Sequence, residues 1–160
     1  MKLKRILLSL TIVSLSLGFS SFQQENESLV WLKIEQVDEY IIKENRPVLI
    51  DLYTSWCGWC KHMDKNTFSD PVVSAYLKEN FYVVKFNAER TTPVNFRGKS
   101  YGRVPDTKYN ELAVAMLNGK MAFPTIVYLD ATGAYHSTDP GYKTPEQLLV
   151  KLKEIVAESK

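Results

Sequence analysis

The sequence predicts an α/β domain in which helices flank a central β-sheet. Short apolar runs rich in β-branched and aromatic residues alternate along the chain with segments whose apolar residues recur at helical spacing. One such run, Val48–Tyr53, is apolar on both faces except for Asp51, as expected of a strand inside a sheet. With 160 residues, 45% of them hydrophobic, the chain has the length and composition of one domain with a full core.

The first 21 residues have the layout of a secretory signal peptide. A basic start, Lys2 to Arg5, precedes an apolar run from Ile6 to Phe19, and small residues near Ser20 suit cleavage. An uncleaved N-terminal membrane anchor is the alternative, although the run is short for a bilayer. We therefore expect an exported, periplasmic protein, a location in which disulfides persist.

Removal of this segment changes the charge of the protein. It takes away three of the 20 basic residues and none of the 18 acidic ones, so a formal charge of +2 becomes −1. No basic surface suited to nucleic acid or an anionic membrane is then expected. We expect a monomer.

The domain is predicted over residues 30–160, after a flexible polar leader at 22–29. Its first elements in order are a strand over Val30–Ile34, a helix over Glu35–Asn45, the strand Val48–Tyr53 and a helix from Cys57 to about Asn66. Pro71 suits the first turn of a further helix, Val72–Glu79, with Asp70 or Ser69 as its cap. A strand over Phe81–Phe86 follows.

A long connection, about 88–119, follows this strand. Phe96–Tyr101 has the pattern of a hairpin that turns on Gly98-Lys99, and Val104–Thr107 is expected to be loop. Tyr109–Leu117 is predicted as a helix that Gly119 ends. We expect the hairpin-like part, Thr92–Pro105, to lie outside the minimal fold and to contact a partner.

The last part of the chain is predicted as two strands and a helix. The strands Ile126–Leu129 and Tyr135–Ser137 are joined by a turn at Thr132-Gly133 and form an antiparallel pair. Thr144 is the expected cap of the final helix, because Pro145 and Gln147 occupy the positions that a capped helix start favours.

Cys57 and Cys60 are the two cysteines of the chain. A zinc site needs four ligands, but His62 is too close in sequence to complete one and His136 stands alone. A passive staple is the other alternative, but it would close so small a loop that it adds little stability. A redox-active pair at a strand-to-helix junction is the favoured interpretation, because a helix N-terminus stabilises a thiolate at Cys57.

The sequence resembles the thioredoxin superfamily. W-C-G-W-C-K at 56–61 matches its W-C-x-x-C-K motif, Asp51 matches its buried acid, and Phe123-Pro124-Thr125 matches its cis-proline loop. The resemblance covers about Val30 to Ala157. It implies a thioredoxin fold of order β-α-β-α-β-α-β-β-α, with a mixed sheet and an inserted segment before the cis-proline loop. Residues 51–73 are similar to the C-terminal periplasmic domain of the membrane reductant transporter of Gram-negative bacteria.

The resemblance implies a disulfide Cys57–Cys60, with Cys57 as the exposed attacking thiolate and Cys60 as the more buried resolving thiol. Asp51 is the candidate base for Cys60, because a carboxylate inside an apolar strand is costly unless it is neutral or solvated; an acid hydrogen-bonded for structure alone is the alternative. Asp64 would share a helix face with Cys60 and matches an acid in the narrower family. Lys85 matches the lysine that accompanies the buried acid; a solvated lysine at a strand end is the alternative.

The candidate substrate-binding residues surround the cysteines. Trp56 and Trp59 could form an apolar seat for polypeptide, with Gly58 between the cysteines. A cis bond before Pro124 would leave the Phe123 backbone free to pair with a bound peptide strand.

These residues predict a thiol–disulfide oxidoreductase that reduces protein disulfides. The partners would be protein disulfide substrates and an upstream dithiol protein that donates electrons, so no metal or organic cofactor is expected. Two alternatives remain: a disulfide oxidase or isomerase, and a non-catalytic binding module with the same fold.

Overall fold

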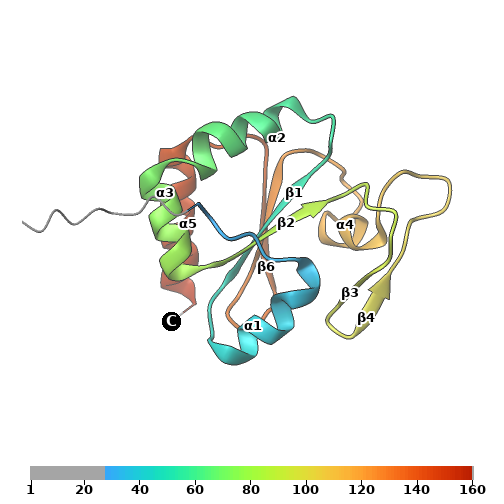
Figure 1. The fold of residues 1–160 in the computed structure, drawn as a ribbon, viewed down its shortest axis with the longest axis horizontal. Coiled ribbons are helices and arrows are strands. Elements are labelled where there is room, and N and C mark those ends of the chain that lie inside the picture. The colour runs from blue at the N-terminus through green and yellow to red at the C-terminus, as the bar shows by residue number, and fades with distance from the viewer. Residues whose placement is uncertain (1–27, 160) are drawn as a thin grey trace, which may run out of the picture.

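The computed structural model describes residues 28–159 (Figure 1). The predicted signal peptide, 1–21, and most of the predicted leader lie outside the described residues. The elements in chain order are η1 (Ile34–Gln36), α1 (Val37–Lys43), β1 (Val48–Tyr53), α2 (Gly58–Met63), η2 (Asp64–Phe68), α3 (Pro71–Asn80), β2 (Tyr82–Asn87), β3 (Val94–Phe96), β4 (Lys99–Tyr101), α4 (Glu111–Met116), β5 (Thr125–Leu129), β6 (Tyr135–Pro140) and α5 (Pro145–Glu158).

The main sheet has four strands in the order β2-β1-β5-β6. β1 pairs in parallel with β2 and antiparallel with β5, and β5 pairs antiparallel with β6. The sheet is therefore mixed, as the resemblance predicts. The pairing sets Asp51 opposite Lys85 on β2 and Leu52 opposite Thr125 on β5.

The side chains of β1 alternate between two cores, because successive residues of a strand point to opposite faces. Ile50 and Leu52 belong to a core shared with η1, α1 and α4, whereas Leu49 belongs to one shared with α2, α3 and α5. Figure 1 shows these two groups of helices on opposite sides of the sheet. Asp51, two residues from Leu49, therefore faces the layer that contains α2.

The helix caps agree closely with the sequence analysis. Asp70 caps α3, with Pro71 in its first turn. Thr144 caps α5 in a capping box, in which its hydroxyl accepts from the Gln147 N–H and the Gln147 amide oxygen accepts from the Thr144 N–H. Asn110 caps α4, and Asn118 and Gly119 end it in left-handed conformations.

The predicted first strand, Val30–Ile34, is wrong. Only Leu32 pairs with β2: it forms a single parallel bridge to Val84, and its N–H donates to the Val83 carbonyl at 2.8 Å. The chain then turns into η1, which buries Ile34, and α1, which buries Val37. These two apolar side chains are buried by a helical turn rather than by an extended strand.

The helix predicted from Cys57 to Asn66 also differs in detail. α2 spans Gly58–Met63, and the next turn, η2, is a π-helix that ends at Phe68. The wide π turn brings the consecutive residues Thr67 and Phe68 inward, and both are buried.

The β3–β4 hairpin turns one residue earlier than predicted, at Arg97-Gly98. Both residues have positive φ, 53° and 72°, as a two-residue type I′ turn requires. Contacts with distant segments offset the strain at Arg97: its N–H donates to Asp38 Oδ2 at 3.1 Å, and its Nη1 donates to the Thr132 carbonyl at 3.0 Å.

The segment Thr92–Pro105, predicted to lie outside the minimal fold, contains the separate two-stranded sheet β3–β4, but one face of this hairpin packs into the core of the domain. Val94 and Phe96, alternate residues of β3, are buried in the same core as Ile50 and Leu52 of β1. The strand points this face inward and leaves Asn95 exposed on the other. The hairpin therefore contributes to folding.

We predict that Phe96→Ala lowers the free energy of unfolding by about 3 kcal/mol, because removal of a buried ring leaves a cavity. Asn95→Ala, on the exposed face of the same strand, should change this free energy by less than about 0.5 kcal/mol. Urea unfolding followed by circular dichroism measures both. Equal stability of the two variants would show that the hairpin is not part of the core.

Candidate active site

The two cysteines lie where β1 leads into α2. The Cys57 N–H donates to the Thr54 carbonyl at 3.2 Å, and this contact closes the turn after the strand. Cys57 is the N-cap of α2, with extended backbone, and its Sγ accepts a hydrogen bond from the Cys60 N–H at 3.0 Å. A disulfide joins the two residues, whose Cα atoms are 5.3 Å apart.

Both cysteines are buried in this disulfide form. Cys57 is 4% exposed and Cys60 2%, so the expectation of an exposed Cys57 does not hold here. Cys57 Sγ is bonded to Cys60 Sγ and also accepts the hydrogen bond from the Cys60 N–H. The neighbouring indoles of Trp56 and Trp59 are instead 58% and 62% exposed. Gly58 is exposed as well, and a Cβ there would meet no atom within 4 Å.

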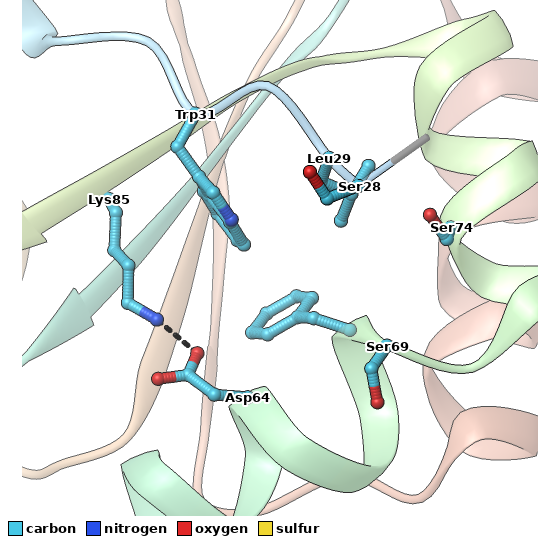
Figure 2. A pocket seen from close by; sticks show the side chains of 8 residues that line it. Ser28, Leu29, Trp31, Asp64, Ser69, Ser74 and Lys85 are labelled. Carbon is cyan, nitrogen blue, oxygen red and sulfur yellow. Dashed lines mark hydrogen bonds and ion pairs between the residues drawn. The ribbon is translucent and has the colours of Figure 1, made fainter. Parts of the chain in front are cut away.

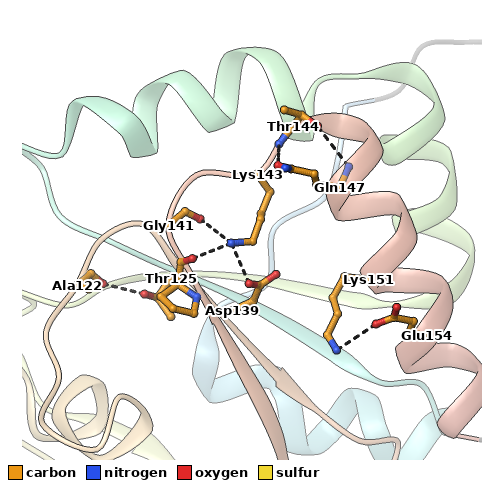
Figure 3. Close-up of polar contacts among 10 residues, drawn as sticks. Ala122, Thr125, Asp139, Gly141, Lys143, Thr144, Gln147, Lys151 and Glu154 are labelled. Carbon is orange, nitrogen blue, oxygen red and sulfur yellow. Dashed lines mark hydrogen bonds and ion pairs between the residues drawn. The ribbon is translucent and has the colours of Figure 1, made fainter.

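The Phe123–Pro124 peptide bond is cis, as the resemblance predicts. The loop lies beside the end of β1, because Thr125 pairs with Leu52. The Thr125 hydroxyl donates to the Ala122 carbonyl at 2.9 Å (Figure 3), and the Gly141 N–H donates to the Pro124 carbonyl at 2.8 Å. Within residues 28–159, no hydrogen bond engages the Phe123 backbone.

Lys143 fixes the turn that follows β6. Its Nζ donates to the Pro140 carbonyl at 2.7 Å and pairs with the Asp139 carboxylate at 2.8 Å (Figure 3). Its own carbonyl accepts from the Thr67 hydroxyl at 2.6 Å, which joins this turn to η2. Tyr142 is thereby held beside Trp59, with ring centroids 5.4 Å apart.

Asp51 is almost fully buried, at 1% exposure, and neither of its oxygens has a hydrogen-bond partner among the described residues. Lys85 Nζ lies 3.6 Å from Asp51 Oδ2 and also bonds to Asp64 Oδ1. Figure 2 shows the Lys85–Asp64 pair at the edge of an open cavity of about 610 Å³, which Trp31 and Phe68 also line. Asp51, Lys85 and Asp64 therefore form a chain from the interior to the surface.

Burial raises the pKa of Asp51 from its ordinary 3.8 to about 7. The Lys85 ammonium lowers this pKa, but not enough to offset burial, and the Asp64 carboxylate raises it further. The Asp51 carboxyl can therefore take up or release a proton near neutral pH.

Aromatic side chains stand on both sides of the disulfide. Trp56 Nε1 donates to Glu89 Oε1 at 3.0 Å, and the Trp56 ring meets Phe123 edge-on at 6.3 Å. On the other side Trp59 contacts His62, with ring centroids 5.6 Å apart, and Tyr142. The predicted site residues therefore lie in the segment after β1, in the loop before β5, or, for Asp51 and Lys85, inside the paired strands β1 and β2.

No motif in the sequence marks Glu89 or Tyr142, which contact Trp56 and Trp59 in the structure. Glu89 follows β2 and Tyr142 follows β6, and both strands run parallel to β1. Because the carboxyl ends of such strands meet at one edge of a sheet, their positions just after strands were the available signal.

The described residues contain neither a metal-ligand cluster nor a helix suited to spanning a membrane. In this part of the chain no cluster of three or more His, Cys, Asp or Glu side chains is arranged to hold a metal ion. None of the helices between residues 28 and 159 has the length and apolar composition that crossing a membrane requires.

The fold and the Cys57–Cys60 pair define a thioredoxin-like protein of the disulfide oxidoreductase class. The family model described as a thioredoxin-like domain matches residues 34–155, and the chain belongs to this family. The solution structure of a thioredoxin from Thermus thermophilus superposes with a TM-score of 0.61 at 19% identity, covering 83% of this chain and 91% of that one. A DsbH oxidoreductase superposes with a TM-score of 0.58 at 15% identity, covering 82% of this chain and 86% of that one.

Among curated proteins, the chain is similar to the thiol:disulfide interchange protein DsbD of Escherichia coli (strain K12). The two are 26% identical over 141 residues, 82% of this chain and 22% of that protein. The DsbD of Vibrio vulnificus (strain CMCP6) is 38% identical over 66 residues, 38% of this chain and 11% of that protein. The oxidised C-terminal domain of Neisseria meningitidis DsbD superposes with a TM-score of 0.50 at 18% identity, covering 74% of this chain and 88% of that one. The chain spans about a fifth or less of these curated relatives.

We predict that Asp51→Asn changes how stability depends on pH. The unfolded chain releases the Asp51 proton near 3.8 and the folded protein near 7, so the folded protein loses about 4 kcal/mol of stability as pH rises between these values. The variant lacks this carboxyl and should not show this loss. Urea unfolding of the oxidised protein from about pH 4 to pH 8 measures it.

Glu154→Gln, on the surface of α5, is the control for this experiment. It removes one carboxylate that pairs with Lys151 at 3.3 Å and is 54% exposed. Its stability curve should run parallel to that of the unchanged protein. If the Asp51→Asn curve were parallel too, the folded and unfolded pKa values of Asp51 would be the same.

Proposed function

We propose that this protein is an exported, periplasmic thiol–disulfide oxidoreductase that reduces protein disulfides through Cys57 and Cys60. The observation that carries the proposal is the disulfide at the start of α2, where the Cys60 N–H donates to Cys57 Sγ. The same contact, retained in the reduced protein, stabilises a thiolate at Cys57. The similarity to DsbD, a thiol:disulfide interchange protein, supports the proposed reaction, and the signal-peptide layout of residues 1–21 supports the periplasmic location.

In the reaction, the Cys57 thiolate attacks one sulfur of a substrate disulfide. A Cys57–substrate disulfide forms, the substrate bond breaks, and the other substrate sulfur leaves as a thiolate that takes up a proton. Cys60 then loses its proton and attacks Cys57 Sγ, which forms the Cys57–Cys60 disulfide and releases the second substrate thiol. The substrate has gained two electrons, which an upstream dithiol protein restores to the pair.

Asp51 is the proposed base that accepts the Cys60 proton. Its pKa of about 7 suits this role at neutral pH, since the group must both accept and release the proton. Lys85 and Asp64 connect Asp51 to the open cavity in Figure 2, and we assign them the transfer of that proton to solvent.

Trp56, Gly58, Trp59, Phe123 and Pro124 are the proposed substrate-binding residues. The unpaired backbone of Phe123 suits a β-augmentation contact with an extended peptide next to its disulfide. The exposed indoles supply apolar surface on both sides of the reacting sulfur.

The proposed direction, reduction, follows from the charges near the cysteines. A strong oxidant stabilises its thiolate, whereas Asp51 and Asp64 disfavour negative charge nearby. Lys85 opposes them, but it is already shared between these two carboxylates. The alternatives are an oxidase or isomerase and a non-catalytic binding module.

The reduction potential separates these directions. We predict a value near that of thioredoxin, about −270 mV, from equilibration with glutathione redox buffers. A potential more positive than about −180 mV would identify an oxidase or isomerase. Failure to reduce insulin with dithiothreitol as electron donor would favour the binding module.

We predict different behaviour for the two cysteine variants. Cys60→Ser retains the attacking Cys57 thiolate but lacks the thiol that breaks the Cys57–substrate disulfide, so this mixed disulfide should accumulate. Cys57→Ser should be inactive and should trap none. Non-reducing gels of cell-envelope extracts measure the adducts, and equal trapping by both variants would reverse the assigned roles.

A further inference from the structure

Trp56 is an exposed side chain that is nevertheless held in place by the chain itself. Its indole N–H donates to Glu89 Oε1 at 3.0 Å, although 58% of the residue is exposed. Phe123 supports the ring edge-on from the cis-proline loop, with centroids 6.3 Å apart. An exposed Trp without such partners would change rotamers freely.

The long connection between β2 and β5 supplies a further contact. Lys108 Nζ lies 4.4 Å from the centroid of the Trp56 ring, and it forms an ion pair with Glu89 Oε1 at 2.9 Å. The same carboxylate oxygen thus binds both Trp56 and Lys108. The adjacent Tyr109 packs against Phe123, with centroids 6.0 Å apart. Residues 108 and 109 therefore contact both aromatic groups on this side of the disulfide.

The charges in this cluster support one another. The hydrogen bonds from Trp56 and then from Lys108 lower the pKa of Glu89, and Glu89 raises the pKa of Lys108. Both groups are therefore charged at neutral pH. An ammonium over the face of an indole is attracted to its π electrons, so Lys108 stabilises the ring position that the Glu89 hydrogen bond defines.

We propose that Lys108 is a specificity-determining residue that, together with Glu89, fixes the Trp56 indole as a platform for the polypeptide next to a substrate disulfide. The inference rests on the proposed reductase function and deepens it, because it names the residues that hold the surface for the polypeptide around a substrate disulfide. A freely rotating side chain loses conformational entropy when it binds a substrate. The Glu89–Lys108 pair already restricts the Trp56 side chain, so Trp56 loses less entropy on binding. A small disulfide without flanking residues does not reach the platform and gains nothing from it.

The test compares a polypeptide disulfide with a small one. The reduced protein is mixed with insulin or with bis(2-hydroxyethyl) disulfide, and the two second-order rate constants are measured. Lys108→Met removes the charge and keeps a similar apolar stem, so the insulin rate relative to the small-disulfide rate should fall about fivefold, the size expected for an exposed cation–π contact. Lys108→Arg can stack and pair in the same way and should keep the ratio within about twofold.

Two other variants control for general effects on the connection. Lys99→Met removes a lysine that also stacks on a ring, that of Tyr101 at 4.8 Å, but in the hairpin; it should leave the ratio unchanged. Glu89→Gln keeps an acceptor for the Trp56 N–H and loses the ion pair, so it should lower the ratio as Lys108→Met does. Because the two residues act through one contact, the double variant should fall no further.

A spectroscopic measurement separates positioning from a general loss of structure. The chain has three Trp residues, and only the ¹⁵N–¹H indole signal of Trp56 should shift and broaden in Lys108→Met. Trp56→Phe assigns that signal. Equal ratios for Lys108→Met and Lys99→Met, or an unmoved Trp56 signal, would overturn the inference. If the unchanged protein reduced neither disulfide, the proposed function itself would fail.

Discussion

The structure depends on the burial of β1 on both faces. Its position between β2 and β5 gives it hydrogen-bonded neighbours on both edges, and helices cover the sheet on either side. A strand so enclosed is fixed in register, because a shift by one residue would exchange the side chains of its two faces. The loop that carries Cys57 begins at the end of this strand, so a strand enclosed on both faces and both edges positions the disulfide.

The burial of β1 also indicates that Asp51 has a functional rather than a purely structural role. An isolated carboxylate would be costly here, and among residues 28–159 the one cation that pairs with Asp51 is Lys85, 3.6 Å away and shared with Asp64. A purely structural role would favour hydrogen bonds to both Asp51 oxygens, but the described residues provide none. The arrangement instead leaves the carboxyl near its titration point. The folded protein thus loses stability at neutral pH to keep a proton-accepting group in β1, the strand that leads to Cys57.

The sequence was sufficient to predict those elements whose signals are local. β1, the caps Asp70 and Thr144, and the cis bond before Pro124 were recognised from short patterns or from a family motif. It was not sufficient where distant packing decides the outcome. The apolar pattern of residues 30–34 fits a strand as well as the observed turn into η1. The burial of Phe96 depends on its packing against β1, which is distant in sequence and which no local pattern reveals. Glu89 and Lys108 are ordinary surface residues in sequence and become part of the site only through Trp56.

The connection between β2 and β5 combines two tasks that use different side chains. Val94 and Phe96 contribute apolar burial to the core, whereas Lys108 and Tyr109 contact the aromatic groups beside the disulfide. Because the first pair is buried and Lys108 is exposed, substitutions at Lys108 should cost little stability, which suits the recognition role that we propose for it. The loop from which Lys108 reaches Trp56 is anchored by the buried Asn110, whose Nδ2 donates to the Arg90 and Tyr101 carbonyls. A connection anchored in this way can hold an exposed indole in one place, which a flexible loop could do only at a cost in entropy on binding.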